Sequence, residues 1–438
     1  MRLLILTILF LASFPVGAAP SKRDLERAID AYVAPYLRHH AFSGVVLVAH
    51  GDRVLTAKGY GMANYEFGVP IVPGTRFALA SISKMFTRAI LTRLYEQKLL
   101  TPDDKLSKWV PDFPSADKIT IGQLVAHRSG IRDPEKLRRK IPTNLTTAET
   151  VAALEVEPLG GVPGETYSYT TANYAVLAHV IELVTGREFA DVMQQYVYAP
   201  AKMYDSGELT RTTVVPRLAT GYMPDPYSEG VAVCGPEDAS WKAGGGSSFS
   251  TAGDLHRFVQ AFYGGRFFAA SPREVWPVAT VFNRVVGRAS GAVPGANAAF
   301  LRFLNEDLTV VVLSNNYAVV VPTIAQDVAA IYLGEPYVSP SLPARVDPPP
   351  PLDPRIAGVY SLETRPEPFT IAIRNGRPFM SWNSTRQSAL IPLGENRWLI
   401  PLDWGTLTLE RNADGSYEQG SMTAIWADAP LKVTRRKE

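Results

Sequence analysis

A serine and a lysine stand one helical turn apart in the stretch from Phe77 to Phe86, and this pair could carry out nucleophilic chemistry. Apolar residues recur at helical spacing after Ser81, which predicts a buried helix with Ser81 in its first turn. Lys84 shares its face, because residues three apart are neighbours on a helix. A serine hydroxyl attacks a carbonyl once another group takes its proton, and a lysine does this when burial or a nearby cation lowers its pKa. The helix N-terminus would offer N–H groups to the resulting oxyanion.

The S-x-x-K spacing alone is not specific, because Ser115 and Lys118 repeat it in a polar segment flanked by proline. We expect this second copy to be a surface loop. The alternative for Ser81 is a helix cap whose lysine faces water, and spacing alone leaves both interpretations open. His127, after a predicted helix from Ile121 to Ala126, is either catalytic or a residue that hydrogen-bonds the following loop.

Composition excludes several classes of protein. The chain has 438 residues, enough for more than one domain, and a formal net charge of only +2. Basic residues form no stripe with interleaved aromatics, so nucleic acid is not an expected partner. The single cysteine, Cys234, cannot form an internal disulfide. No histidine or cysteine spacing is typical of a metal site, so we expect neither a metal nor a cofactor.

The first 19 residues are typical of a secretory signal peptide. Arg2 supplies the positive charge, an apolar run extends from Leu3 to Phe14, and small residues at 17–19 offer a cleavage site. The run is too short to span a bilayer comfortably, and no other transmembrane candidate follows. We therefore expect export to the periplasm or the outside. The sequence does not indicate the oligomeric state.

The elements that must position Ser81 and Lys84 predict an α+β fold, with an antiparallel sheet packed on helices and an all-helical region. A helix over 22–37 precedes a hairpin, 43–49 with 54–61. Strands at 299–303 and 309–314 precede a helix at 322–332. Tyr169 follows a tight glycine-rich loop and stands where a helix begins, so its phenol could reach into a cleft. The glycines at 244–246 predict a close-packed loop beside that cleft.

A second domain follows a proline-rich linker at 346–351. Beyond it, from 352 to 438, the pattern changes to short strands, including a hairpin across Asn375-Gly376 and a strand from Ser421 to Trp426. We expect a small antiparallel barrel or sandwich there. Residues 20–345 would form the domain that carries the chemistry.

Four stretches together resemble one family. They are FALASISKMFTRAI from Phe77, KITIGQLVAHRSGI from Lys118, PGETYSYTTANYAVLAHVIELVTG from Pro163 and AGGGSSFSTAGDLHRF from Ala243. In these stretches the chain is similar to the serine β-lactamase-related proteins, which include class C β-lactamases, D-Ala-D-Ala carboxypeptidases and esterases. The similarity spans roughly 22–332 and implies a β-lactamase/transpeptidase-like fold. The tail from 352 is similar to the barrel-like C-terminal domains of some members.

The resemblance implies a role for each matching residue. Ser81 would be the acylated nucleophile, and Lys84 would take or relay its proton. Tyr169 matches the tyrosine of the Y-x-N motif, a second proton carrier near the leaving group. Which of Lys84 and Tyr169 is the base stays open, because a coupled pair need not have one proton owner. The backbone N–H groups of Ser81 and Ala292 would form the oxyanion hole. The residues implied to contact substrate are Thr171, Ser290 and Gly291.

Two positions depart from the family pattern. Thr171 stands where the asparagine of Y-x-N belongs. The third motif, K-x-G or H-x-G, reads Ala289-Ser290-Gly291 when counted back from Pro294, so its cation is missing. Arg288 is adjacent, but neighbouring strand residues point to opposite faces. We therefore expect an exported serine hydrolase acting on neutral esters or amides. The alternative is a weak or inactive member that acts as a binding or scaffold protein.

Overall fold

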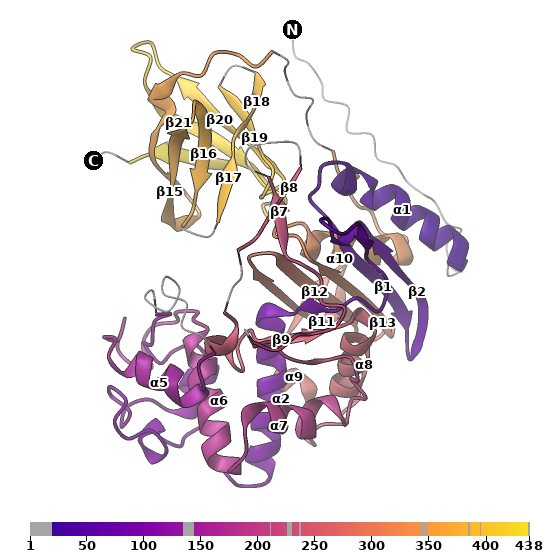
Figure 1. The fold of residues 1–438 in the computed structure, drawn as a ribbon, viewed down its shortest axis with the longest axis vertical. Coiled ribbons are helices and arrows are strands. Elements are labelled where there is room, and N and C mark those ends of the chain that lie inside the picture. The colour runs from indigo at the N-terminus through magenta and orange to yellow at the C-terminus, as the bar shows by residue number, and fades with distance from the viewer. Residues whose placement is uncertain are drawn as a thin grey trace.

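The computed structural model describes the chain from Pro20 to Arg436. Within that range it omits 135–143, 211, 226–229, 236–237, 342, 344–345, 347, 384–385 and 395. The predicted signal peptide therefore lies outside the described residues. The described part contains an α+β domain followed by a smaller β domain (Figure 1). None of its helices is both long and apolar enough to cross a bilayer.

A six-stranded antiparallel sheet forms the centre of the first domain, in the order β10-β11-β12-β13-β1-β2. Its strands are β1 (Gly44–His50), β2 (Arg53–Tyr60), β10 (Val278–Val281), β11 (Arg284–Val293), β12 (Ala296–Phe303) and β13 (Leu308–Ser314). The N-terminal hairpin joins the later strands because β1 pairs with β13, with Gly44 opposite Ser314. The predicted hairpins of this sheet are confirmed within one to three residues at most ends.

Helices cover both faces of this sheet, and β1 shows why. Val46 and Val48 lie in one hydrophobic cluster with the inner faces of α1 (Lys22–Arg38) and α10 (Val321–Leu333). Val45 and Leu47 lie in the other cluster, with α2 (Ser83–Glu96) and α8 (Ala252–Tyr263). Successive side chains of a strand point to opposite faces, so an apolar run such as β1 serves two helical layers at once.

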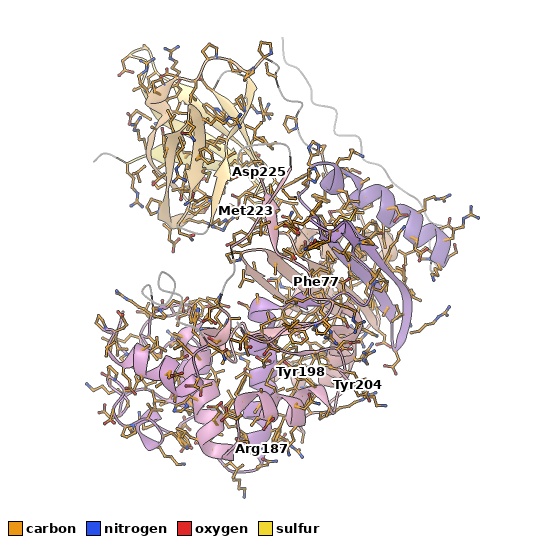
Figure 2. The ribbon with its side chains drawn as sticks, viewed as in Figure 1. Phe77, Arg187, Tyr198, Tyr204, Met223 and Asp225 are labelled. Atoms are coloured by element: carbon orange, nitrogen blue, oxygen red, sulfur yellow. The ribbon has the colours of Figure 1, made fainter. Side chains whose placement is uncertain are left out.

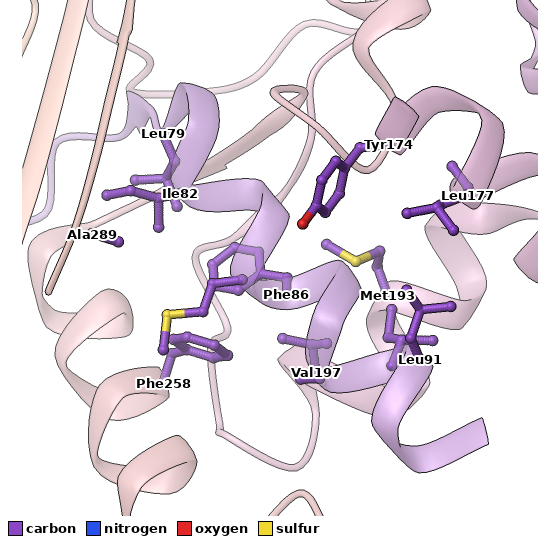
Figure 3. Packing of buried hydrophobic residues seen from close by; sticks show 14 of the residues in the cluster. Leu79, Ile82, Phe86, Leu91, Tyr174, Leu177, Met193, Val197, Phe258 and Ala289 are labelled. Atoms are coloured by element: carbon purple, nitrogen blue, oxygen red, sulfur yellow. The ribbon is translucent and has the colours of Figure 1, made fainter. Parts of the chain in front are cut away.

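The second of these layers continues into the helical region, with α2 (Ser83–Glu96) at its centre. Phe86 of α2 packs edge to face on Phe258 of α8, with 4.4 Å between ring centroids. Figure 3 shows Leu177, Met193 and Val197 packed along the same helix. The other helices are α3 (Ile121–Val125), α5 (Thr147–Glu155), α6 (Ala172–Thr185), α7 (Phe189–Met193), α8 (Ala252–Tyr263) and α9 (Pro272–Val275).

Short strands and turns join the sheet to the helical region. The strands are β3 (Met62–Asn64), β4 (Val69–Pro70), β5 (Phe77–Ala78), β6 (Gly207–Glu208), β7 (Tyr222–Pro224), β8 (Val231–Val233) and β9 (Ser248–Ser250). The single-turn helices are η1 (Ala80–Ile82), η2 (Leu106–Lys108), η3 (Gln194–Tyr198) and η4 (Ser240–Lys242). Figure 2 places Phe77 inside this domain and Met223 on the β7–β8 hairpin.

The second domain is a nine-stranded antiparallel sheet that nearly closes into a barrel, in the order β17-β16-β15-β14-β22-β21-β20-β19-β18. The turn η5 (Pro354–Ile356) precedes it. Its strands are β14 (Gly358–Leu362), β15 (Arg365–Arg374), β16 (Arg377–Ser381), β17 (Gln387–Ala389), β18 (Ile391–Gly394), β19 (Arg397–Ile400), β20 (Gly405–Arg411), β21 (Tyr417–Thr423) and β22 (Leu431–Arg435). Asn375 and Gly376 both adopt positive φ, as a two-residue hairpin turn requires.

One strand prediction in the barrel is wrong. The strand expected from Ser421 to Trp426 ends at Thr423. The Trp426 indole instead donates to Asp403 (3.1 Å), and the Ile425 N–H donates to the Asp403 carbonyl. These bonds turn the chain away from the strand ladder.

The barrel packs on the first domain through the segment that follows β19. The Trp404 ring lies 4.6 Å from the Tyr36 ring of α1, and the Val319 N–H donates to the Leu402 carbonyl (3.0 Å). The described residues of the predicted linker form no helix or strand.

Candidate active site

A sharp turn between β5 and α2 presents Ser81. Ala80, directly before it, adopts a left-handed backbone with φ of 48°, which a residue with a side chain adopts only at a cost. Hydrogen bonds to β9 hold the turn: the Leu79 N–H donates to the Ser248 carbonyl (2.8 Å). The Ser83 hydroxyl donates to the Ala80 carbonyl (2.7 Å) and accepts from the Ser248 N–H (3.1 Å). The predicted helix begins only at Ser83, so Ser81 lies in the single turn η1 before it, and the sequence did not predict this strained entry.

Two of the predicted catalytic groups, the Tyr169 hydroxyl and the Lys84 amine, contact the third, Ser81 Oγ. The Tyr169 hydroxyl donates to Ser81 Oγ at 2.8 Å, and Lys84 Nζ lies 3.3 Å from the same oxygen. Lys84 Nζ also donates to the Gly245 carbonyl at 2.7 Å, so the predicted glycine-rich loop does lie beside the site. Lys84 Nζ lies 4.9 Å from the centre of the Tyr169 ring. This arrangement suits proton transfer to and from the serine oxygen.

The environment of Lys84 favours its neutral form. The side chain is only 2% exposed, and burial lowers its pKa to about 7. The charge of Lys242 lowers the pKa further, while Asp133 opposes both effects. A lysine in water has a pKa near 10.4, so this amine is far better able to accept a proton at neutral pH than an exposed one.

The environment of Tyr169 shifts its pKa in the opposite direction. Burial raises its pKa to about 12, although the hydrogen bond with Ser81 partly offsets this. The residue as a whole is half exposed (52%), while its hydroxyl contacts the serine. The phenol therefore keeps its proton at neutral pH and acts as a donor.

His127 contacts the Tyr169 ring and hydrogen-bonds to the segment that carries it. Its ring lies 4.5 Å from the Tyr169 ring, its Nδ1 accepts from the Thr170 N–H (3.3 Å), and its carbonyl accepts from the Ser168 N–H (2.8 Å). Burial and the charges of Lys84 and Arg88 lower its pKa to about 4, so the ring is neutral and can accept. Of the two predicted roles, the structure shows the loop hydrogen bonds.

Asp133 is a supporting residue that the sequence analysis missed. Its carboxylate accepts from the N–H groups of Thr171 (2.7 Å) and Ala172 (3.0 Å), and from the Thr170 hydroxyl. Free N–H groups at a helix N-terminus favour a negative charge, so Asp133 fixes the start of α6 beside Tyr169. Nothing in the sequence signals this contact, because about forty residues separate the partners.

Strand β11 passes directly beside the nucleophile. A Cβ on Gly291 would lie 2.3 Å from the Leu79 carbonyl oxygen and 2.7 Å from the Ser81 nitrogen, so only glycine fits. Ala292, the predicted second oxyanion donor, follows on the same strand, and Ser290 is exposed. Ala289 is buried beside Ile82 (Figure 3), whereas Arg288 is exposed on the other face. Arg288 therefore does not replace the missing cation.

Thr171 lies beside the loop that holds Lys84. A Cβ on Gly245 would come within 2.8 Å of the Thr171 methyl carbon, so the two residues are in close contact. The predicted contact of Thr171 with substrate stays a prediction.

The second S-x-x-K copy has none of this environment. Ser115 and Lys118 belong to a loop in which the Lys118 N–H donates to the Ser115 carbonyl (2.8 Å), and Lys118 is exposed. The prediction of a surface loop is confirmed. In the described ranges, no group of three or more histidine, cysteine or acidic side chains is arranged to hold a metal.

Residues 25–320, more than half of the chain, match the model of the family described as Beta-lactamase. The chain belongs to the beta-lactamase family of serine hydrolases. It is 28% identical over 348 residues to Penicillin-binding protein 4* of Bacillus subtilis (strain 168), covering 70% of this chain and 75% of that protein.

Two other similar proteins are informative. Teichoic acid D-alanine hydrolase of Staphylococcus aureus is 28% identical over 224 residues, which cover 51% of this chain and only 55% of that protein. The octameric penicillin-binding protein homologue of Pyrococcus abyssi has a similar fold, with a TM-score of 0.62 at 18% identity. That match covers 94% of this chain and 99% of the other.

Proposed function

We propose that this protein is an exported serine hydrolase that forms an acyl-enzyme on Ser81 and acts on esters or amides. One observation carries the proposal: the serine oxygen has an amine of lowered pKa at 3.3 Å and a phenol at 2.8 Å. Similar arrangements of nucleophile, proton acceptor and oxyanion donors recur in acyl-transfer enzymes. Small-molecule or peptide-like substrates fit this chemistry.

In this mechanism Lys84 is the base and Tyr169 the acid. Neutral Lys84 takes the proton of Ser81 as the serine oxygen attacks the carbonyl carbon. The N–H groups of Ser81 and Ala292 hold the oxyanion. Tyr169 gives its proton to the leaving alcohol or amine as the bond to it breaks, and Lys84 then returns a proton to the phenol. A water molecule next attacks the acyl-enzyme, which releases the acid and restores Ser81. The pKa values of about 7 and about 12 support this division of roles.

The substrate should lack a free carboxylate next to Ala289. A short buried methyl group occupies the place where the family carries a lysine or histidine. A carboxylate there would meet no cation, so β-lactam or D-Ala-D-Ala cleavage should be inefficient. Two relatives carry the names of a penicillin-binding protein and a D-alanine hydrolase, and the second name suits an ester or amide substrate.

Labelling with a fluorophosphonate tests the proposal. We expect one covalent adduct by intact-mass measurement of the mature protein, which Ser81→Ala abolishes and Ser115→Ala leaves in place. Ser115 is the matched control because it stands in the same S-x-x-K spacing without the environment. No adduct on the folded wild-type protein would overturn the proposal and favour the binding or scaffold role that Ala289 and Thr171 suggest.

A further inference from the structure

A cavity of about 370 Å³ lies beside β5, the short strand that leads to Ser81. Phe77 and Ala78, the residues of β5 that lead to Ser81, form one part of its wall. Gly246 forms another part, next to the carbonyl that holds Lys84. Val293, directly after Ala292 on β11, forms a third. The cavity is therefore in the size range of ligand sites, and its wall includes the strand that leads to Ser81 and the residue that follows Ala292.

The position of this cavity identifies the part of the substrate that it takes. Its described lining residues come from 77–78, 209–246 and 293–315, and none belongs to the segment that carries Tyr169. If Tyr169 protonates the leaving group, the leaving group lies on that side of the carbonyl. The acyl chain is then attached away from Tyr169, on the side of the carbonyl carbon from which it can extend toward the cavity. The lining is largely apolar, with Leu209, Leu218 and Val233 among its members, so it suits the methylene part of an acyl chain.

One charged side chain reaches this apolar wall. Among the described lining residues, Lys242 alone carries a charge, and its side chain is 7% exposed. A Cβ on Gly246 would lie 3.5 Å from Lys242 Cδ, so the lysine stem runs along the cavity wall. An ammonium carries three N–H donors and can serve several oxygen atoms at once. In a site of low dielectric such a donor binds a carboxylate strongly.

Lys242 also belongs to the loop that positions Lys84. Its carbonyl accepts from the N–H groups of both Gly245 and Gly246 (2.8 Å each), which fixes the turn. The Gly245 carbonyl at the end of that turn accepts from Lys84 Nζ. One short loop thus holds the amine of Lys84 and places a second buried lysine, Lys242, at the wall of the cavity.

We propose that Lys242 makes this cavity selective for acyl groups that end in a carboxylate, such as the monoester of a short dicarboxylic acid. This inference rests on the proposed acyl-enzyme mechanism and names its substrate class. The cation missing at Ala289 is thereby supplied on another element, at the acyl side of the nucleophile. The chemistry is unchanged: Ser81 Oγ displaces the alcohol, and water later releases the dicarboxylate.

Two esters of matched shape test the inference. The mono-p-nitrophenyl ester of glutaric acid ends in a carboxylate, and p-nitrophenyl 5-methylhexanoate ends in an isopropyl group of similar shape. The rate with Ser81→Ala protein corrects for the attack of the free carboxylate on its own ester. We expect wild-type kcat/KM to favour the glutarate ester by at least about tenfold, the range of a hydrogen bond to a charged group.

Variants of Lys242 then test whether its positive charge, and not an effect on the fold, causes the preference for the glutarate ester. Lys242→Met should abolish the preference, Lys242→Gln should reduce it, and Lys242→Arg should retain most of it. The ratio is measured at one pH, so a change in the pKa of Lys84 affects both esters equally. Lys105→Met, at an exposed lysine, should leave the ratio unchanged. Equal hydrolysis of both esters by wild type, or an unchanged ratio in Lys242→Met, overturns the inference but leaves the acyl-enzyme intact. Failure to hydrolyse either ester, with no adduct on Ser81, overturns the proposed function itself.

Discussion

The chain contains the S-x-x-K spacing twice, and the two copies differ in almost everything except that spacing. Lys84 is 2% exposed and contacts Ser81 and the Gly245 carbonyl, whereas Lys118 is exposed on a loop. Both copies even contain a left-handed residue, Ala80 before one serine and Ser115 itself in the other. The difference lies in what surrounds each pair: β9, β11 and the Tyr169 segment converge on the first copy only. Spacing supplies reactive groups, and tertiary contacts make them reactive.

Substituting the lysine of each copy in turn should give the largest difference between the two copies. Lys84→Met should lower kcat/KM for an activated ester by roughly 10²- to 10⁴-fold, the usual contribution of a general base. Lys118→Met should leave it within about twofold, because an exposed lysine on a loop touches nothing in the site. Steady-state kinetics of both variants measure the contrast. Equal effects of the two substitutions would contradict the account.

Substitutions of Tyr169 and of the nearby Tyr167 separate the effect of a catalytic phenol from that of a neighbouring one. Tyr169→Phe keeps the ring against His127 but removes the donor at 2.8 Å from Ser81 Oγ, so turnover should fall by roughly a hundredfold. The loss should be larger for amides than for p-nitrophenyl esters, whose leaving group needs no proton. Tyr167→Phe, two residues earlier at an exposed ring, is the control and should have little effect. An equal loss for both classes of substrate would argue against a donor role.

A substitution at Gly291 tests whether the backbone of β11 sets the geometry beside Ser81. Gly291→Ala places a Cβ 2.3 Å from the Leu79 carbonyl oxygen, and β11 must shift away from Ser81 to relieve the clash. We expect kcat to fall by roughly tenfold to a hundredfold through a distorted oxyanion hole. Arg288→Lys, at an exposed position of the same strand, is the control. Circular dichroism and thermal melts of both variants check that the fold persists. A fully active Gly291→Ala would show that the strand does not set this geometry.

Much of the fold could be predicted from local patterns. Apolar periodicity located α2 and the central strands, and Asn375-Gly376 located a hairpin of the barrel. Ser81, Lys84 and Tyr169 were named from motifs, and the structure brings their polar atoms together. Prediction failed where distant segments decide the outcome. The strand expected at 421–426 ends at Thr423, because Trp426 hydrogen-bonds to Asp403 instead of continuing the strand. No local sequence signal indicates this contact.

The same limit applies to the supporting residues of the site. Asp133 caps α6 from a loop that contains no helix signal, and Lys242 reaches the acyl cavity from a glycine-rich loop. Their types are ordinary surface types, so sequence alone gives no reason to single them out. The left-handed Ala80 was missed for the opposite reason, since alanine normally favours a helix.

The pH dependence of Ser81 labelling tests the central claim most directly, because it measures the base without a leaving-group proton. Burial lowers the pKa of Lys84 to about 7, so the amine is protonated and inactive below that pH and neutral above it. We predict that the second-order rate of fluorophosphonate labelling rises sigmoidally with a midpoint near 7. In Lys242→Met the midpoint should move upward, since the charge of Lys242 contributes to lowering that pKa. A wild-type labelling rate that is flat from pH 5 to 9, or that rises only near the ordinary lysine pKa of about 10.4, would contradict the account.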